Sequence, residues 1–224
     1  MAEISKFAKA FVRFTGPELA TQEAMYGFIM ALIFITSAQV GLISYSSPMD
    51  IVALIVGMNF VWGVVDMYVF YKMDVTAHRR YVEVLSGEGC CNHTEHYLMV
   101  YDALGSTIVD ALAEEDKEKV VDLVMNGRIE SREEMREGRR AMLLSAVSCF
   151  LITLLTTVPL VLCLALVEEP YAALWSASTA ASVCLFFAGY LMEPSKRRSR
   201  KILTGASIMT LALALTLFAA YLGG

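Results

Sequence analysis

The residue with the clearest chemical potential is Asp66, a carboxylate inside a long apolar stretch of the chain. An aspartate at the centre of a membrane helix costs ~2.5–3.5 kcal/mol on insertion scales, so such residues usually face a cavity, a partner or an ion path. Asp66 lies about five residues, or ~7 Å along a helix, from the end of its stretch. An interfacial or helix-pairing aspartate is the alternative interpretation, and we place an ion-conducting role ahead of it.

Polar and sulfur-containing residues continue along the same face of the helix that Asp66 would occupy. Carboxylate, imidazole and thioether groups bind divalent transition metals, and methionine favours the softer ions. The pattern therefore predicts metal ligands on this helix, although a methionine in an apolar stretch is also an ordinary core residue. Residues at helical spacings of three or four are Asn59, Gly63, Asp66, Phe70, Asp74 and His78, and Met67 flanks them. The predicted ligands are Asp66, Met67, Asp74 and His78.

A second group of potential ligands lies further along the chain, at Cys90, Cys91, His93 and His96. Thiolates and imidazoles are the usual ligands of tetrahedral zinc sites. The group lacks the second ligand pair that a complete zinc motif has at a fixed distance. A metal site and a polar turn that caps a helix are both open interpretations, and a dimer that brought two copies together would favour the metal site.

The composition identifies the kind of protein that must position these residues. Of 224 residues, 57% are hydrophobic and 18% are charged, whereas soluble domains average ~45–50% and ~25%. The apolar residues are concentrated in stretches close to the ~20 residues that cross a bilayer as a helix. We therefore predict an all-α, multi-pass integral membrane protein whose five transmembrane helices contact the lipid bilayer. The predicted spans cover 24–44, 51–71, 141–167, 171–192 and 202–222.

Three domains follow from this pattern: 1–71 with an N-terminal amphipathic segment and two spans, 72–140 as a helical domain, and 141–224 with three spans. Inside 72–140, a helix that Asn92 or Thr94 caps should carry an apolar stripe from Tyr97 to Leu112. A further helix should run from Glu114 to Met125. A capping box formed by Ser131 and Glu134 should open the helix that leads into the third span.

The distribution of Lys and Arg predicts the orientation in the membrane. Basic residues occur in the N-terminal segment, at both ends of the 72–140 domain and in the turn 196–201, and the two remaining turns have none. The N-terminus and the 72–140 domain should therefore be cytoplasmic and the C-terminus outside. The 196–201 turn should contact anionic lipids rather than nucleic acid. The N-terminal basic residues are Lys6, Lys9 and Arg13.

Enzyme motifs are not present in the sequence. There is no nucleophile elbow, no phosphate-binding glycine loop and no HExxH zinc motif. We therefore expect no enzymatic activity, no catalytic residues and no organic cofactor.

Several short motifs, taken with the order of spans, resemble the vacuolar iron transporter (VIT/CCC1-like) family. The resemblance covers the membrane portion through the entry to the first span, the proline-bearing third span and the C-terminal end. The motifs are Glu23-Ala24-Met25-Tyr26-Gly27, Thr156-Thr157-Val158-Pro159-Leu160, Phe187-Ala188-Gly189-Tyr190-Leu191, the basic turn and Gly205.

This resemblance implies a homodimer that exports ferrous iron and similar divalent ions from the cytoplasm. It also implies ion loading through glutamates and methionines of the cytoplasmic domain, where this chain has cysteines and histidines. Met30 stands where the family has an aspartate in the first span. Glu23, Met30 and Asn59 are additional candidates for the transport path.

The expected function is proton-coupled export of a divalent transition-metal ion, with Fe²⁺, Mn²⁺ or Zn²⁺ as substrate or ligand. The alternative is a non-transporting membrane scaffold or metal sensor that acts through the 72–140 domain.

Overall fold

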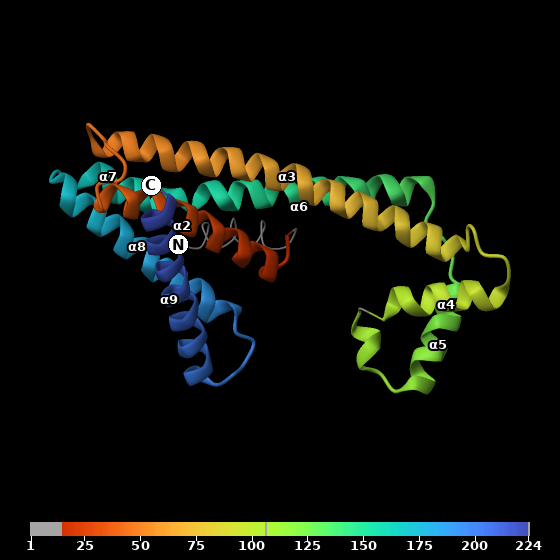
Figure 1. Ribbon diagram of the computed structural model, residues 1–224. Helices are drawn as coiled ribbons and strands as arrows, with labels where there is room; N and C mark the ends of the chain where they lie inside the picture. Colours follow the sequence, from red (N-terminus) through yellow and green to blue (C-terminus); the bar gives the residue numbers. More distant parts are fainter. Residues whose placement is uncertain (1–14, 106, 224) are drawn as a thin grey trace, which may run out of the picture. The chain divides into compact units, whose positions relative to one another are not determined.

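The computed structural model describes residues 15–105 and 107–223, and every regular element in them is a helix (Figure 1). The basic N-terminal residues Lys6, Lys9 and Arg13 lie outside the described part. The helices are α2 (Pro17–Gln39), α3 (Pro48–Ser86), α4 (His93–Leu104), the 3₁₀ helix η1 (Ile108–Ala111), α5 (Glu114–Met125), α6 (Arg132–Leu155), α7 (Thr157–Leu166), α8 (Pro170–Met192) and α9 (Arg198–Gly223).

Five helical stretches are long and apolar enough to cross a membrane. This confirms the predicted all-α architecture and describes a multi-pass integral membrane protein. The stretch that contains Asp66 is the longest, because α3 continues without interruption for 39 residues. The five stretches are Pro17–Gln39, Pro48–Ser86, Glu133–Leu166, Pro170–Met192 and Arg198–Leu222.

The first span begins and ends earlier than the apolar stretch 24–44 suggested. Pro17 opens α2 at a position where its missing N–H and fixed φ are favourable. The helix ends at Gln39, and Gly41 has a φ of 80°, a conformation that favours glycine. The N–H of Leu42 donates to the carbonyl of Ser37 at 2.9 Å. Local capping therefore sets these bounds, and apolar length does not.

The chain forms two compact units: residues up to Val69 together with residues from Leu144 onward, and Phe70–Leu143. In the first unit α8 packs against α2, α7 and α9, and α9 also packs against α2. Leu32, Leu174 and Leu185 are completely buried in its core.

Small residues allow the helices of this unit to approach closely, as is common where membrane helices pack. A Cβ added to Gly189 of α8 would lie only 3.0 Å from the Cα of Gly205 in α9. Alanines on α8 are also fully buried, among them Ala173, Ala177 and Ala181. The close packing of α8 with α9 thus depends on the absence of large side chains.

The second unit contains α4, η1 and α5 beside the flanking parts of α3 and α6. Its core is small and forms around Val84, Val100 and Val121. α5 has the predicted bounds, and the predicted capping box is confirmed: Ser131 N donates to Glu134 Oε2 at 2.7 Å, and Glu134 N donates to Ser131 Oγ at 3.3 Å.

The apolar stripe predicted to reach Leu112 on one helix is wrong in its second half. α4 ends at Leu104, and the chain turns through η1. Gly105 is a poor helix former, and Thr107 caps the new turn by accepting a hydrogen bond from Val109 N at 3.2 Å. Ile108 is 88% exposed as a result.

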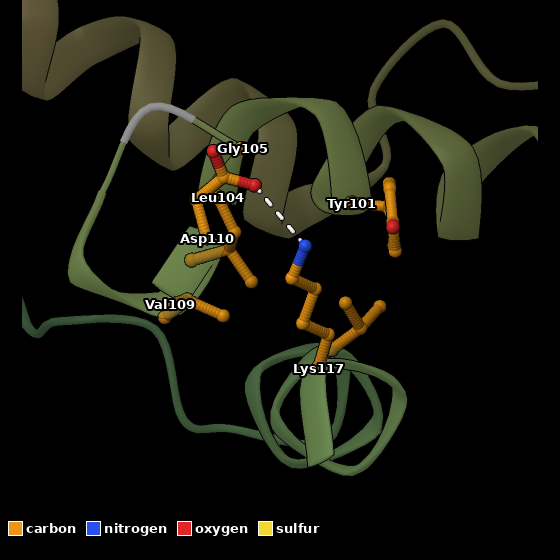
Figure 2. Close-up of a pocket in the computed structure, with 7 residues that line it drawn as sticks. Tyr101, Leu104, Gly105, Val109, Asp110 and Lys117 are labelled. Atoms are coloured by element: carbon orange, nitrogen blue, oxygen red, sulfur yellow. Dashed lines mark hydrogen bonds and ion pairs between the residues drawn. The ribbon is translucent and has the colours of Figure 1, made fainter. Parts of the chain in front are cut away.

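Lys117 holds η1 against α5 (Figure 2). Its Nζ lies 3.1 Å from Asp110 Oδ1 and 3.8 Å from Glu114 Oε2. Tyr101 of α4 donates its hydroxyl hydrogen to Glu114 Oε1 at 2.5 Å. These residues line a small cavity, and their polar contacts join α4, η1 and α5.

The hydrogen bond to Glu114, together with desolvation, raises the pKa of Tyr101 above its ordinary value. Because folding favours the neutral phenol of Tyr101, the hydrogen bond to Glu114 stabilises the second unit fully at pH values below the pKa that Tyr101 has in the unfolded chain. It is lost as the pH rises through the folded pKa. Ultraviolet titration should show late-ionising tyrosine absorbance that decreases by one tyrosine in Tyr101→Phe. A difference titration with an ordinary tyrosine midpoint would contradict this contact.

Candidate functional site

Polar side chains from three membrane-spanning stretches meet inside the first unit. Glu23 comes from α2, Asn59 and Asp66 come from α3, and Thr153 comes from α6. Glu23, Asn59 and Thr153 have no exposed surface, and Asp66 is half-buried. Polar groups at membrane depth are expensive and usually mark function. We call Glu23, Asn59, Asp66 and Thr153 the polar cluster.

The two carboxyl groups of the polar cluster contact each other. Glu23 and Asp66 lie within hydrogen-bonding range, one on each of two different helices. Two carboxylate oxygens attract each other only through a proton or a cation between them, because like charges repel strongly in a medium of low dielectric constant. The pair therefore has the chemistry of a site that holds a positive charge.

Hydrogen-bond donors near the Glu23–Asp66 pair reach Glu23 but not Asp66. Thr153 Oγ1 donates to Glu23 Oε2 at 3.0 Å and also lies 3.1 Å from the carbonyl of Cys149, and its single hydrogen serves one of them at a time. Asn59 Nδ2 donates to the carbonyl of Ile55 at 2.9 Å. Neither donor reaches Asp66.

Three buried oxygens of the cluster have no hydrogen-bond partner within the described residues: Glu23 Oε1, Asn59 Oδ1 and Asp66 Oδ2. Neither carboxylate is in an ion pair formed by residues 15–105 and 107–223. Buried polar atoms in native proteins are nearly always partnered, so each of these three oxygens has the capacity to bind a donor or a cation. All three are acceptors, and acceptors of this kind are ligands for a cation.

An interruption between α6 and α7 lies next to the cluster. α6 ends at Leu155 and α7 starts at Thr157. Pro159 has no N–H for the carbonyl four residues earlier, which breaks the helical ladder. Two threonine hydroxyls donate to carbonyls before the break: Thr156 to Thr153 at 2.6 Å, and Thr157 to Leu154 at 2.7 Å. Broken membrane helices with freed backbone groups commonly line transport sites.

Gly27 brings α2 close to this break. A Cβ at Gly27 would clash with Thr156 Oγ1, and it would lie 3.1 Å from Thr156 Cβ and 3.2 Å from Asn59 Oδ1. Only hydrogen fits there, and Glu23 lies one helical turn earlier on the same face of α2. Gly27 therefore permits the approach that places Glu23 beside Asp66.

Other predicted ligands on the two helices have different surroundings. Met30 and Met67 are half-buried and belong to the first unit. Asp74 and His78 belong to the second unit, where Asp74 is exposed. His78 Nε2 lies 3.4 Å from Glu130 Oε2, and this contact was not predicted.

The segment with Cys90, Cys91, His93 and His96 forms the turn that starts α4. Cys91 and His93 are exposed, and Cys90 is half-buried. The ring of His96 folds back, with Nε2 2.9 Å from the carbonyl of Val84.

Backbone contacts account for much of this turn. Asn92 Oδ1 accepts from Glu95 N at 2.8 Å, and Glu95 Oε2 accepts from Cys91 N at 2.8 Å. Desolvation, with smaller effects of Glu95 and Cys91, raises the pKa of the Cys90 thiol and disfavours the thiolate that binds metals. In the part of the chain that the structure describes, no three His, Cys, Asp or Glu side chains are arranged to hold a metal ion.

Sequence reasoning found Asp66 from its position and named Asn59 and Glu23 as path candidates. It did not assign roles to Thr153 or Gly27. The Thr-Thr-Val-Pro motif at 156–159 was a usable signal, because threonines before a proline often satisfy a broken membrane helix.

Comparisons with models of known protein families, with curated proteins and with solved structures give no match. The resemblance to vacuolar iron transporters therefore stays a prediction based on short motifs.

Proposed function

We propose that this protein transports a divalent transition-metal cation, such as Fe²⁺ or Mn²⁺, across its membrane. The Glu23–Asp66 pair is the proposed binding site of the cation inside the membrane. The observation that carries this proposal is the set of three unpartnered buried oxygens, on Glu23, Asn59 and Asp66.

The chemistry of these oxygens fits a hard or borderline divalent cation. Two carboxylates neutralise one divalent charge, and amide and hydroxyl oxygens of Asn59 and Thr153 complete a partly hydrated shell. Met30 and Met67 lie on the same two helices and would favour the softer Fe²⁺ if they take part.

Protons give the same site an exchange mechanism. When the cation leaves, two carboxylates in contact cannot both stay charged at membrane depth, and protons replace it. Alternating occupancy by a divalent cation and by protons couples metal movement to proton movement in the opposite direction.

The direction of transport rests on the distribution of basic residues. Lys and Arg of the 72–140 domain and of the 196–201 turn favour placing both at the cytoplasmic surface. Export from the cytoplasm by a homodimer then follows from the resemblance to vacuolar iron transporters. Asp74, exposed on the second unit, is a candidate for attracting cations before they enter.

Uptake of Fe²⁺ or Mn²⁺ into proteoliposomes tests the proposal, with Asp66→Asn as the main variant. Removing one of the two charges should reduce uptake at least about tenfold, the loss expected for a hydrogen bond or ligand contact to a charged group. Glu83→Gln is the matched control, because Glu83 is an exposed carboxylate on the same helix and is not among the proposed ligands. It should retain most of the uptake at saturating metal.

Uptake by Asp66→Asn at the wild-type rate would rule out the proposed passage at Asp66. No uptake of any divalent ion by the folded wild-type protein would favour the non-transporting scaffold or sensor.

A further inference from the structure

A second cavity lies within the second unit, between the end segments of α3 and α6. Its volume is about 190 Å³, well above the ~10–15 Å³ that one water needs. The lining residues are Val75, His78, Arg79, Val82, Met135, Arg139 and Met142. It contains none of the residues of the polar cluster.

Two guanidinium groups give this cavity its charge. Arg79 comes from α3 and Arg139 from α6, and both are exposed. Among the residues that the structure describes, neither has a carboxylate within 4.0 Å. Arg139 Nη2 lies 3.9 Å from the sulfur of Met135. His78, which also lines the cavity, has its Nε2 atom 3.4 Å from Glu130 Oε2.

The remaining walls are apolar. Val75, Val82 and Met142 contribute them, and none of these side chains can donate or accept a strong hydrogen bond. A fitting ligand therefore combines an anionic group for the two arginines with an apolar part for the valines and methionines.

On α6, the cavity lies at the predicted start of the third span. The predicted apolar stretch of the third span begins at Ala141. Arg139 lies two residues before it, about 3 Å along α6, and Met142 lies inside it. Lipid headgroups occupy the zone just outside the hydrocarbon core, ~5–8 Å thick on each side. Basic pockets between membrane helices at this level bind anionic headgroups.

We propose that this cavity binds the headgroup phosphate of an anionic phospholipid, with Arg79 and Arg139 as its two cationic contacts. The glycerol and the start of an acyl chain lie against Val75 and Met142, on the membrane side of the two arginines. Such a lipid would link α3 and α6 at the membrane surface. The proposal is independent of cation transport, because it uses none of the oxygens of the polar cluster.

A lipid titration of the purified full-length protein in detergent tests this site, with the thermal unfolding midpoint as readout. Phosphatidylglycerol should raise the midpoint saturably, and phosphatidylcholine should not. In Arg79→Gln/Arg139→Gln the phosphatidylglycerol concentration for half-maximal effect should rise about tenfold or more, as expected for the loss of two basic contacts near a membrane surface.

The matched control is Arg80→Gln/Arg140→Gln. These arginines are the immediate neighbours of the two cavity arginines, and they do not line the cavity. The control removes the same net charge and should leave the titration unchanged. A second variant, Val82→Trp, fills the cavity without changing charge and should also abolish the phosphatidylglycerol effect. It tests the site even if the double arginine variant does not fold.

Several outcomes would overturn the proposal. Equal weakening in both double-arginine variants would mean diffuse attraction to surface charge. An equal effect of phosphatidylcholine would mean that the anionic group is not recognised. The same saturable stabilisation by inorganic phosphate would identify a free anion rather than a lipid as the ligand.

Discussion

Glu23→Gln is expected to abolish metal uptake and, at the same time, to raise the thermal stability of the protein. Glutamine has the shape of glutamate but carries no charge, and its amide nitrogen is a donor. It can keep the hydrogen bond from Thr153 and donate a new one toward Asp66 Oδ2, which has no partner in the described residues. A contact that holds only with a shared proton or a bound cation thereby becomes a hydrogen bond that needs neither.

The expected gain in stability and the expected loss of uptake in Glu23→Gln differ in size. A new buried hydrogen bond to a charged acceptor should stabilise the folded protein by about 1–3 kcal/mol. Loss of one of two charged ligands should reduce uptake at least about tenfold. Thermal unfolding in detergent and uptake into proteoliposomes measure the two effects on the same preparation.

Opposite effects on stability and uptake separate a functional role from a structural one. If Glu23 only stabilised the helix packing, Glu23→Gln would lower the unfolding midpoint and leave uptake unchanged, which would contradict our interpretation. Glu18→Gln is the control, because Glu18 is an exposed carboxylate in the first turn of the same helix. It should leave both measurements close to wild type.

Gly27→Ala is expected to destabilise the first unit strongly, because the added methyl group has no room beside Thr156. The new Cβ would clash with Thr156 Oγ1 and approach Thr156 Cβ to 3.1 Å. Thr156 would have to give up its hydrogen bond to the Thr153 carbonyl. Overpacking of this kind costs about 1–3 kcal/mol, and the lost hydrogen bond adds about 1 kcal/mol.

A compensating substitution tests whether the clash with Thr156 causes the loss of stability in Gly27→Ala. Thr156→Ala removes the hydroxyl that the new methyl group meets, so Gly27→Ala/Thr156→Ala should be more stable than Gly27→Ala alone. The control is Gly57→Ala in α3, where nothing lies within 4 Å of the added Cβ. It should be neutral or stabilising, because alanine is the better helix former. Equal loss of stability in Gly27→Ala and Gly57→Ala would refute the close approach of α2 to Thr156.

The sequence by itself determined the features that depend on neighbouring residues. Apolar stretches of about 20 residues indicated five spanning helices, because a helix of that length crosses the bilayer with its backbone hydrogen bonds satisfied internally. The end of α5 at Asn126-Gly127 and the capping box of Ser131 with Glu134 are likewise contacts within a few residues. The end of α4 was misjudged, because the apolar spacing continues through Gly105 although the helix does not.

The chemistry of individual residues was also recognisable, but their partners were not. Cys90, Cys91 and His93 are typical metal ligands by type, and the structure uses this segment as the capped turn that starts α4. Their ability to bind metal stays a prediction. Residue type indicates what a side chain can bind, whereas the surrounding backbone decides where it points.

Tertiary structure alone decided that Glu23 meets Asp66. The two residues are 43 positions apart, and their contact depends on the rotation of α2 and α3 about their axes and on the distance between them. Gly27 sets that distance, because it lies against Asn59 of α3 and against Thr156, at a helix break 129 residues further along the chain. Hydropathy and periodicity report which residues enter the membrane, but packing between helices determines which of their charges share a site.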